Sequence, residues 1–189
     1  MKHRIAKASV STILSLALIL AGCSTSWIST ALADLPVITQ VALNIASIVA
    51  AAQGKGQASP VVTSQVQNIA AQVKSDLTLV QGLITSYQSA TAAQKPSLVQ
   101  KISAALADVQ TNLNAILSAV HVSDTALQAT IVAAVGVAVT TVASIASLLP
   151  ASAGTVRANN AVKPPSAREL KKQFNAIFAA NGFPQAELK

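Results

Sequence analysis

The stretch that decides the fold is residues 59–87, which read SPVVTSQVQNIAAQVKSDLTLVQGLITSY. Apolar side chains recur in it every three or four residues, with polar ones between them, which is the period of a helix with one buried face. These apolar positions are Val62, Val66, Ile69, Val73, Leu77, Val80, Ile84 and Tyr87. Ser59 and Pro60 suit the N-cap and first turn of that helix. The stretch therefore predicts a long amphipathic helix whose apolar face needs partners.

Further stretches on either side have the same period, and Pro36, Pro60, Pro96 and Pro150 lie at the edges of the apolar runs, where proline is compatible with helix. The first stripe is Leu35, Ile38, Ala42, Ile45, Val49 and Ala52; the third is Leu98, Ile102, Ala105, Val109, Leu113, Ile116 and Val120; the fourth is Leu127, Ile131, Ala134, Ala138, Val142, Ile145 and Leu149. Asp34 and Asp124 are expected to cap the first and fourth helices. Stripes of similar length with short connections predict an all-α fold, an antiparallel up-and-down four-helix bundle over residues 34–150.

Composition and charge fit such a fold. The chain has 189 residues, of which 52% are hydrophobic, 10% charged and 3% aromatic, so the predicted core is aliphatic. Lysines and aspartates cancel over residues 23–156, and the positive excess of the chain beyond the N-terminal segment lies in the tail that starts at Arg157. A charge confined in this way does not predict binding to nucleic acid.

The N-terminus has the organisation of an export signal. Residues 1–7 are basic, residues 10–20 are uncharged, and the run ends in Leu20-Ala21-Gly22-Cys23. This ending resembles the lipobox of bacterial lipoproteins, and the chain's one cysteine stands where that box requires it. Over these two dozen residues the resemblance implies that residues 1–22 are a signal peptide and that Cys23 is lipidated. The alternative is an uncleaved membrane anchor with a bystander cysteine.

Lipidation at Cys23 would place the next residues at a membrane surface. By resemblance to lipoproteins of Gram-negative bacteria, Ser24 rather than aspartate after the cysteine implies sorting to the outer membrane. Residues 23–33 are then a tether that holds the bundle within about 40 Å of the bilayer. Trp27 is expected at the level of the headgroups, a favourable place for an indole ring. The alternative for Trp27 is a hydrophobic contact at the end of the first helix.

Residues 127–149 allow a second interpretation. The segment is uncharged and long enough to cross a bilayer, and Gly136 suits helix packing in lipid. Polar residues such as Thr140 and Ser144 favour a buried bundle helix instead. A membrane-inserting protein, with this helix forming a hairpin with the first helix or a small pore, is therefore the alternative function.

Residues 151–165 predict a linker, and residues 166–189 predict a basic amphipathic helix and tail that begins with a capping box at Ser166 and Glu169. The residues of a docking face would be Arg168, Leu170, Lys171, Lys172, Phe174, Ile177 and Phe178. Such a face either folds back onto the bundle or docks onto an envelope protein, a cell-wall polymer or an anionic lipid surface. In the first case Phe174 and Phe178 belong to the core. We predict the second, in which this segment is separable from the bundle at the linker.

Residues suited to catalysis are scarce. His121 is the one histidine beyond the signal segment, and the chain has no paired carboxylates, no phosphate-binding loop and no metal-ligand spacing. We therefore expect no enzyme activity, no cofactor and no metal, but a lipid-anchored helical protein of the cell envelope with a structural or interaction role. Lys189, the last residue, resembles in that feature alone the terminal lysine by which murein lipoproteins are joined to peptidoglycan, and implies a covalent link to the wall.

Overall fold

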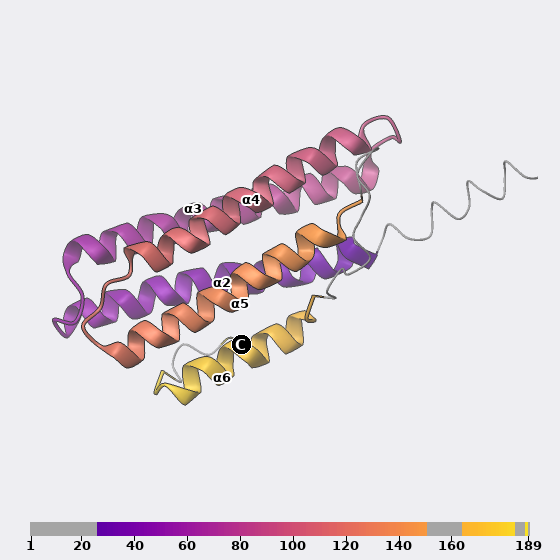
Figure 1. Cartoon of the computed structure of the whole chain (residues 1–189). Coiled ribbons are helices and arrows are strands. Elements are labelled where there is room, and N and C mark those ends of the chain that lie inside the picture. The colour runs from indigo at the N-terminus through magenta and orange to yellow at the C-terminus, as the bar shows by residue number, and fades with distance from the viewer. Residues whose placement is uncertain (1–25, 151–163, 184–187, 189) are drawn as a thin grey trace, which may run out of the picture.

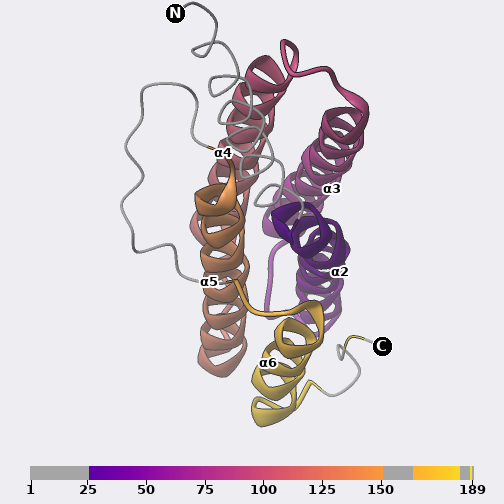
Figure 2. The same cartoon turned by 90° about the vertical axis from the view of Figure 1, so that its right-hand side faces the viewer.

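The computed structural model describes residues 26–150, 164–183 and 188, and all the regular secondary structure in this part of the chain is helical. Its helices are α2 (Ser26–Gly54), α3 (Pro60–Ser89), α4 (Lys95–Ala119), α5 (Thr125–Leu148) and α6 (Ala167–Ala180). The long axes of α2 to α5 are nearly aligned (Figure 1), and α6 lies against α2 and α5 (Figure 2). The prediction of an all-α fold is confirmed.

Three helix starts form as the sequence predicts. The Val62 N–H donates to Ser59 Oγ at 3.2 Å at the start of α3. At α5, Asp124 Oδ1 accepts from the N–H groups of Ala126 at 2.9 Å and Leu127 at 3.1 Å. At α6, Ser166 Oγ accepts from the Glu169 N–H at 3.3 Å. Each side-chain oxygen satisfies a backbone donor that has no partner inside its helix.

The core is built from the predicted stripes. Every residue of the first and fourth stripes is buried, as are most of the second and third, while Val62, Ile69 and Leu98 are half-buried. α3 packs on α2 and on α4, and α5 packs on α4 and on α2, so these helices share one aliphatic core. Burial of the stripes is the main source of stability of these helices, because helix propensity alone contributes little.

The connections after α2 and before α5 are joined to each other. Gly56, at φ 72°, permits the turn that ends α2, and the Gln57 N–H donates to the Ala52 carbonyl at 2.9 Å. The Ser123 N–H then donates to the Gln57 carbonyl at 2.9 Å. This bond fixes the end of α2 beside the start of α5.

The first helix begins earlier than expected. α2 starts at Ser26 rather than near Asp34, and Pro36 lies inside it on the exposed side. Residues 26–33 are therefore helical and are not an extended tether, and Asp34 is a buried mid-helix residue instead of a cap. Trp27, Ile28 and Ala31 extend the apolar stripe and are buried, and this burial outweighs the backbone bond that Pro36 removes.

The C-terminal helix is folded back on the bundle. Leu170, Phe174 and Phe178 are each 0% exposed, and α6 contacts both α2 and α5. This packing goes against the prediction of a separable segment, because the apolar face of α6 is buried on the bundle and its aromatic residues belong to the core. Residues 151–163, which include most of the expected linker, lie outside the described residues.

Candidate functional site

Two of the residues singled out in the sequence, Cys23 and Lys189, lie outside the described part of the chain. Trp27 is 3% exposed, and its ring meets that of Tyr87 edge to face with centroids 5.4 Å apart. Lys95 Nζ lies over the Tyr87 ring, 5.1 Å from its centroid. Trp27 is thus a core residue at the end of the bundle, as the second of its two alternatives predicts.

The predicted docking face is divided by the way α6 packs. Leu170, Phe174 and Phe178 are covered by the bundle, whereas Arg168 and Lys172 are exposed. Lys171 and Ile177 are half-buried. What α6 offers to a partner in this arrangement is therefore a basic outer surface, and its aromatic residues are unavailable.

Asp34 is the most unusual group in the described part of the chain. It is 0% exposed, and neither carboxylate oxygen has a hydrogen-bond partner. Desolvation by burial raises the pKa of Asp34 from 3.8 to about 6, because burial disfavours the charged form. The Trp27 Nε1–H on the same helix is likewise buried without a partner.

Sequence reasoning missed Asp34 because aspartate before a proline is a common helix start. The signal was present in the spacing: Trp27, Ala31, Asp34 and Ile38 are separated by four, three and four residues, which puts Asp34 on the buried stripe. Asp34 is also the one ionisable residue of α2, so protonation leaves this helix without charge.

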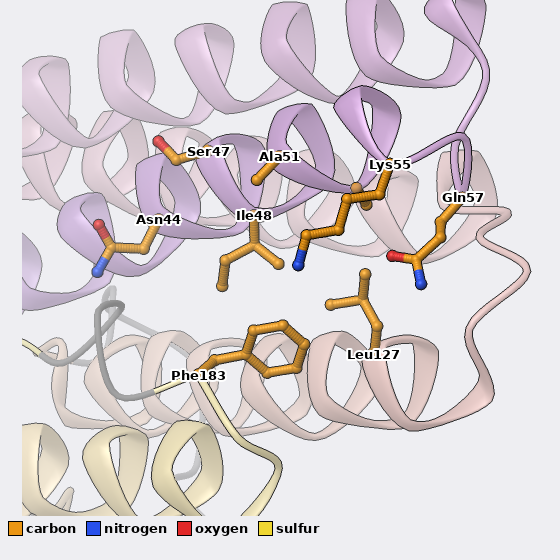
Figure 3. A pocket seen from close by; sticks show the side chains of 9 residues that line it. Asn44, Ser47, Ile48, Ala51, Lys55, Gln57, Leu127 and Phe183 are labelled. Atoms are coloured by element: carbon orange, nitrogen blue, oxygen red, sulfur yellow. The ribbon is translucent and has the colours of Figure 1, made fainter.

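A pocket of about 140 Å³ lies where the end of α2, the start of α5 and the residues after α6 meet (Figure 3). Ile48, Leu127 and Phe183 supply its apolar walls. Polar groups at the pocket come from Asn44, Ser47, Gln57 and Lys55, the last being its one ionisable lining residue. The pocket combines an apolar interior with one cationic side chain, which is the composition of a small-molecule site.

Two glycine turns build this pocket. Gly182, at φ 81°, reverses the chain after α6, and the Phe183 N–H donates to the Phe178 carbonyl at 2.9 Å. Gly56 likewise reverses the chain after α2, and its neighbours Lys55 and Gln57 line the pocket. The Gln57 side-chain amide also donates to Asp124 Oδ2 at 3.4 Å, which links the pocket to the cap of α5.

Other polar residues have structural surroundings. Asp76 on α3 accepts from Gln72 Nε2 and from Asn112 Nδ2 on α4, each at 2.7 Å. His121 is exposed between α4 and α5, with its Nδ1 at 3.3 Å from the Ala119 carbonyl oxygen. Within residues 26–150, 164–183 and 188, no group of three or more histidine, cysteine or acidic residues is placed to hold a metal ion.

Two described helices are long and apolar enough to cross a membrane. They are residues 27–54, with a mean hydropathy of 1.8, and α5, with a mean hydropathy of 2.2. In the most apolar 18-residue stretch of each helix, 56% of the first and 44% of the second is buried in the bundle. Core helices of water-soluble bundles pass the same test, so apolarity alone does not separate the two situations.

Comparison of the chain with protein-family models, with curated proteins and with solved structures finds no match in any of the three.

Proposed function

We propose that this chain is a lipid-anchored, non-enzymatic protein of the bacterial cell envelope with a structural or interaction role. The observation that carries the proposal is the sequence Leu20-Ala21-Gly22-Cys23 at the end of an uncharged run that follows a basic N-terminus. α2 starts at Ser26, three residues after Cys23, so a lipid on that cysteine would hold the bundle by this end. The outer membrane is the proposed location, on the basis of Ser24.

The arrangement proposed for α2 to α5 is an antiparallel, up-and-down four-helix bundle. Two contacts support it: Trp27 at the start of α2 meets Tyr87 at the end of α3, and Gln57 after α2 bonds Ser123 before α5. Short connections of the kind found here join antiparallel neighbours in such bundles. One end of the bundle then carries the start of α2 and the other carries the pocket.

The charges favour an orientation in which the end of the bundle that carries the start of α2 faces the membrane. Lys95 lies beside the ring of Tyr87 at the anchored end, and Lys101 follows it on α4. α6 begins on that side of the molecule (Figure 1), so exposed Arg168 and Lys172 lie in its nearer half, with Glu169 as the acidic neighbour. Basic side chains near an anionic bilayer are attracted to it by about 1 kcal/mol each. The exposed basic residues of α6 are accordingly the proposed contact to anionic lipid, to an envelope protein or to a cell-wall polymer.

Metabolic labelling with a radioactive fatty acid tests the proposal. Cys23→Ser should abolish the label and leave unprocessed precursor, whereas the matched variant Thr25→Ser should be labelled and cleaved as the parent chain is. Normal maturation of Cys23→Ser, or a parent chain that takes up no label, would show that the anchor is not there.

The alternative function is a membrane-inserting protein, and the observation in its favour is that α2 and α5 contact each other and are both apolar enough to span a bilayer. Purification of the chain from Ser24 onward, without detergent, separates the two proposals. A monodisperse helical protein favours the bundle on the membrane surface. A chain that stays in solution only with detergent favours insertion.

A further inference from the structure

We propose that the pocket between α2, α5 and Phe183 binds a small carboxylate whose apolar part has about the size of a benzene ring. Arylcarboxylates and short branched-chain carboxylates belong to this class. The inference does not depend on the lipid anchor, because it rests on the pocket's own size, walls and charge. It assigns a ligand-binding role to the end of the bundle opposite Trp27.

The size of the pocket sets the size of the ligand. Its volume of about 140 Å³ is close to that of an apolar cavity of about 150 Å³ known to hold benzene in another protein. The pocket is open on one side, so a polar group attached to the ring would stay at the mouth.

The walls are apolar and held in place. Ile48 and Leu127 are 7% and 1% exposed, and both belong to the core of the bundle. The backbone of Phe183 is held by the turn at Gly182 and by its N–H bond to the Phe178 carbonyl, and its half-buried side chain packs against the core. Pre-formed walls of this kind spare the ligand the ordering of mobile groups.

The charge of the pocket selects an anion. Figure 3 shows the Lys55 side chain pointing toward the space bordered by Ile48, Leu127 and Phe183. The Lys55 side chain is exposed and is the one ionisable side chain of the pocket lining. The nearby carboxylate of Asp124 is engaged on both oxygens, by the cap of α5 and by the Gln57 amide. A ligand carboxylate would therefore bind the Lys55 ammonium through a charge-assisted hydrogen bond.

Nuclear magnetic resonance of the ¹⁵N-labelled protein tests the inference with three probes of one shape: benzoate, benzyl alcohol and benzylamine. Benzoate should shift the amide signals of Lys55, Gln57, Leu127 and Phe183 in a saturable way. Its affinity should exceed that of neutral benzyl alcohol by about five- to tenfold, as one charge-assisted bond at a solvated mouth provides. Benzylamine should bind more weakly than either.

Three variants at exposed positions make the test specific, because none of them removes a buried side chain. Lys55→Gln should lower benzoate affinity to that of benzyl alcohol, and Lys101→Gln, its matched control on α4, should leave affinity unchanged. Ala51→Leu, which adds bulk at the pocket, should weaken both probes. The inference is overturned if benzoate produces no saturable shifts, if the shifts lie away from the pocket, or if Lys55→Gln binds benzoate as the parent chain does.

Discussion

The ring of Trp27, in the first turn of α2, meets the ring of Tyr87, in the last turn of α3, edge to face, with centroids 5.4 Å apart and planes inclined by 64°. Lys95 from the start of α4 lies over the same Tyr87 ring. Three helices thus meet in one aromatic cluster at the end of an otherwise aliphatic core. Edge-to-face pairs are favourable because the positive edge of one ring faces the negative face of the other.

Replacement of Trp27 by alanine should lower the free energy of unfolding by about 3 to 4 kcal/mol, because a large buried side chain leaves a cavity. Urea unfolding followed by circular dichroism measures it. Trp27→Phe keeps a ring against Tyr87 and removes the unpartnered Nε1–H, so its loss should stay below about 1.5 kcal/mol. A loss from Trp27→Ala as small as that from Trp27→Phe would contradict a buried Trp27.

Stability should depend on pH through Asp34. Its folded-state pKa of about 6 exceeds the unfolded value of 3.8, so the folded protein binds this proton more tightly than the unfolded chain does. The charged form of Asp34 therefore destabilises the folded protein. This destabilisation is absent below pH 3.8, grows as the pH rises toward 6, and is complete above pH 6. Maximal stability with respect to this group therefore lies at acidic pH.

Asp34→Asn removes that dependence, and the variant should gain on the order of 2 kcal/mol relative to the parent chain between about pH 4 and about pH 7. The measurement is urea unfolding of both proteins at the two pH values. Asp108→Asn, an exposed position on α4, is the control and should show no comparable change. An Asp34→Asn difference that is the same at both pH values would refute the placement of a desolvated carboxyl group.

The docking of α6 predicts that Phe174 is a core residue. Phe174→Ala should lower the free energy of unfolding by about 3 to 4 kcal/mol, while Lys172→Ala, on the exposed side of the same helix, should stay within about 0.5 kcal/mol. Removal of the chain after Pro150 should destabilise the rest markedly. An unchanged midpoint of urea unfolding in that truncated chain would mean that residues 166–189 are separable from the bundle.

The same substitution should act in opposite directions at two glycines. Gly136 lies inside α5 with nothing within 4 Å of an added Cβ, so Gly136→Ala should stabilise the protein by about 1 kcal/mol through helix propensity. Gly56 has equal space but a φ of +72°, so Gly56→Ala should destabilise by about 1 kcal/mol. Thermal unfolding of both variants gives the comparison. Loss of stability in Gly136→Ala would contradict the open space around this position in the bundle.

Much of the fold follows from local pattern. The caps at Ser59, Asp124 and Ser166 and the four stripes were predictable because each depends on residues a few positions apart. The start of α2 was not predictable from local pattern, because proline is common in the first turn of a helix and Pro36 therefore indicated a later start. Only the burial of Trp27 and Ile28 by other helices makes the earlier start favourable.

The candidate pocket was beyond prediction for a related reason. Lys55, Leu127 and Phe183 belong to three segments far apart in the chain, and none is unusual in its own segment. They meet because α6 folds back between α2 and α5, a choice that the sequence left open between two alternatives. The burial of Asp34, by contrast, could have been predicted, because its spacing places it on the apolar stripe. Pro36, two residues later, favoured the interpretation of Asp34 as a helix cap instead.

The position of α6 also sets the order in which the chain can mature. Phe174 and Phe178 pack against α2, which precedes them by more than a hundred residues, so the core stays incomplete until α6 has been synthesised. Domains fold as units, and a nascent chain that lacks its last helix keeps apolar surface open. For a chain exported as proposed above, a core that closes only with α6 would leave the precursor unfolded for longer, which is the state that a channel threading unfolded chains requires.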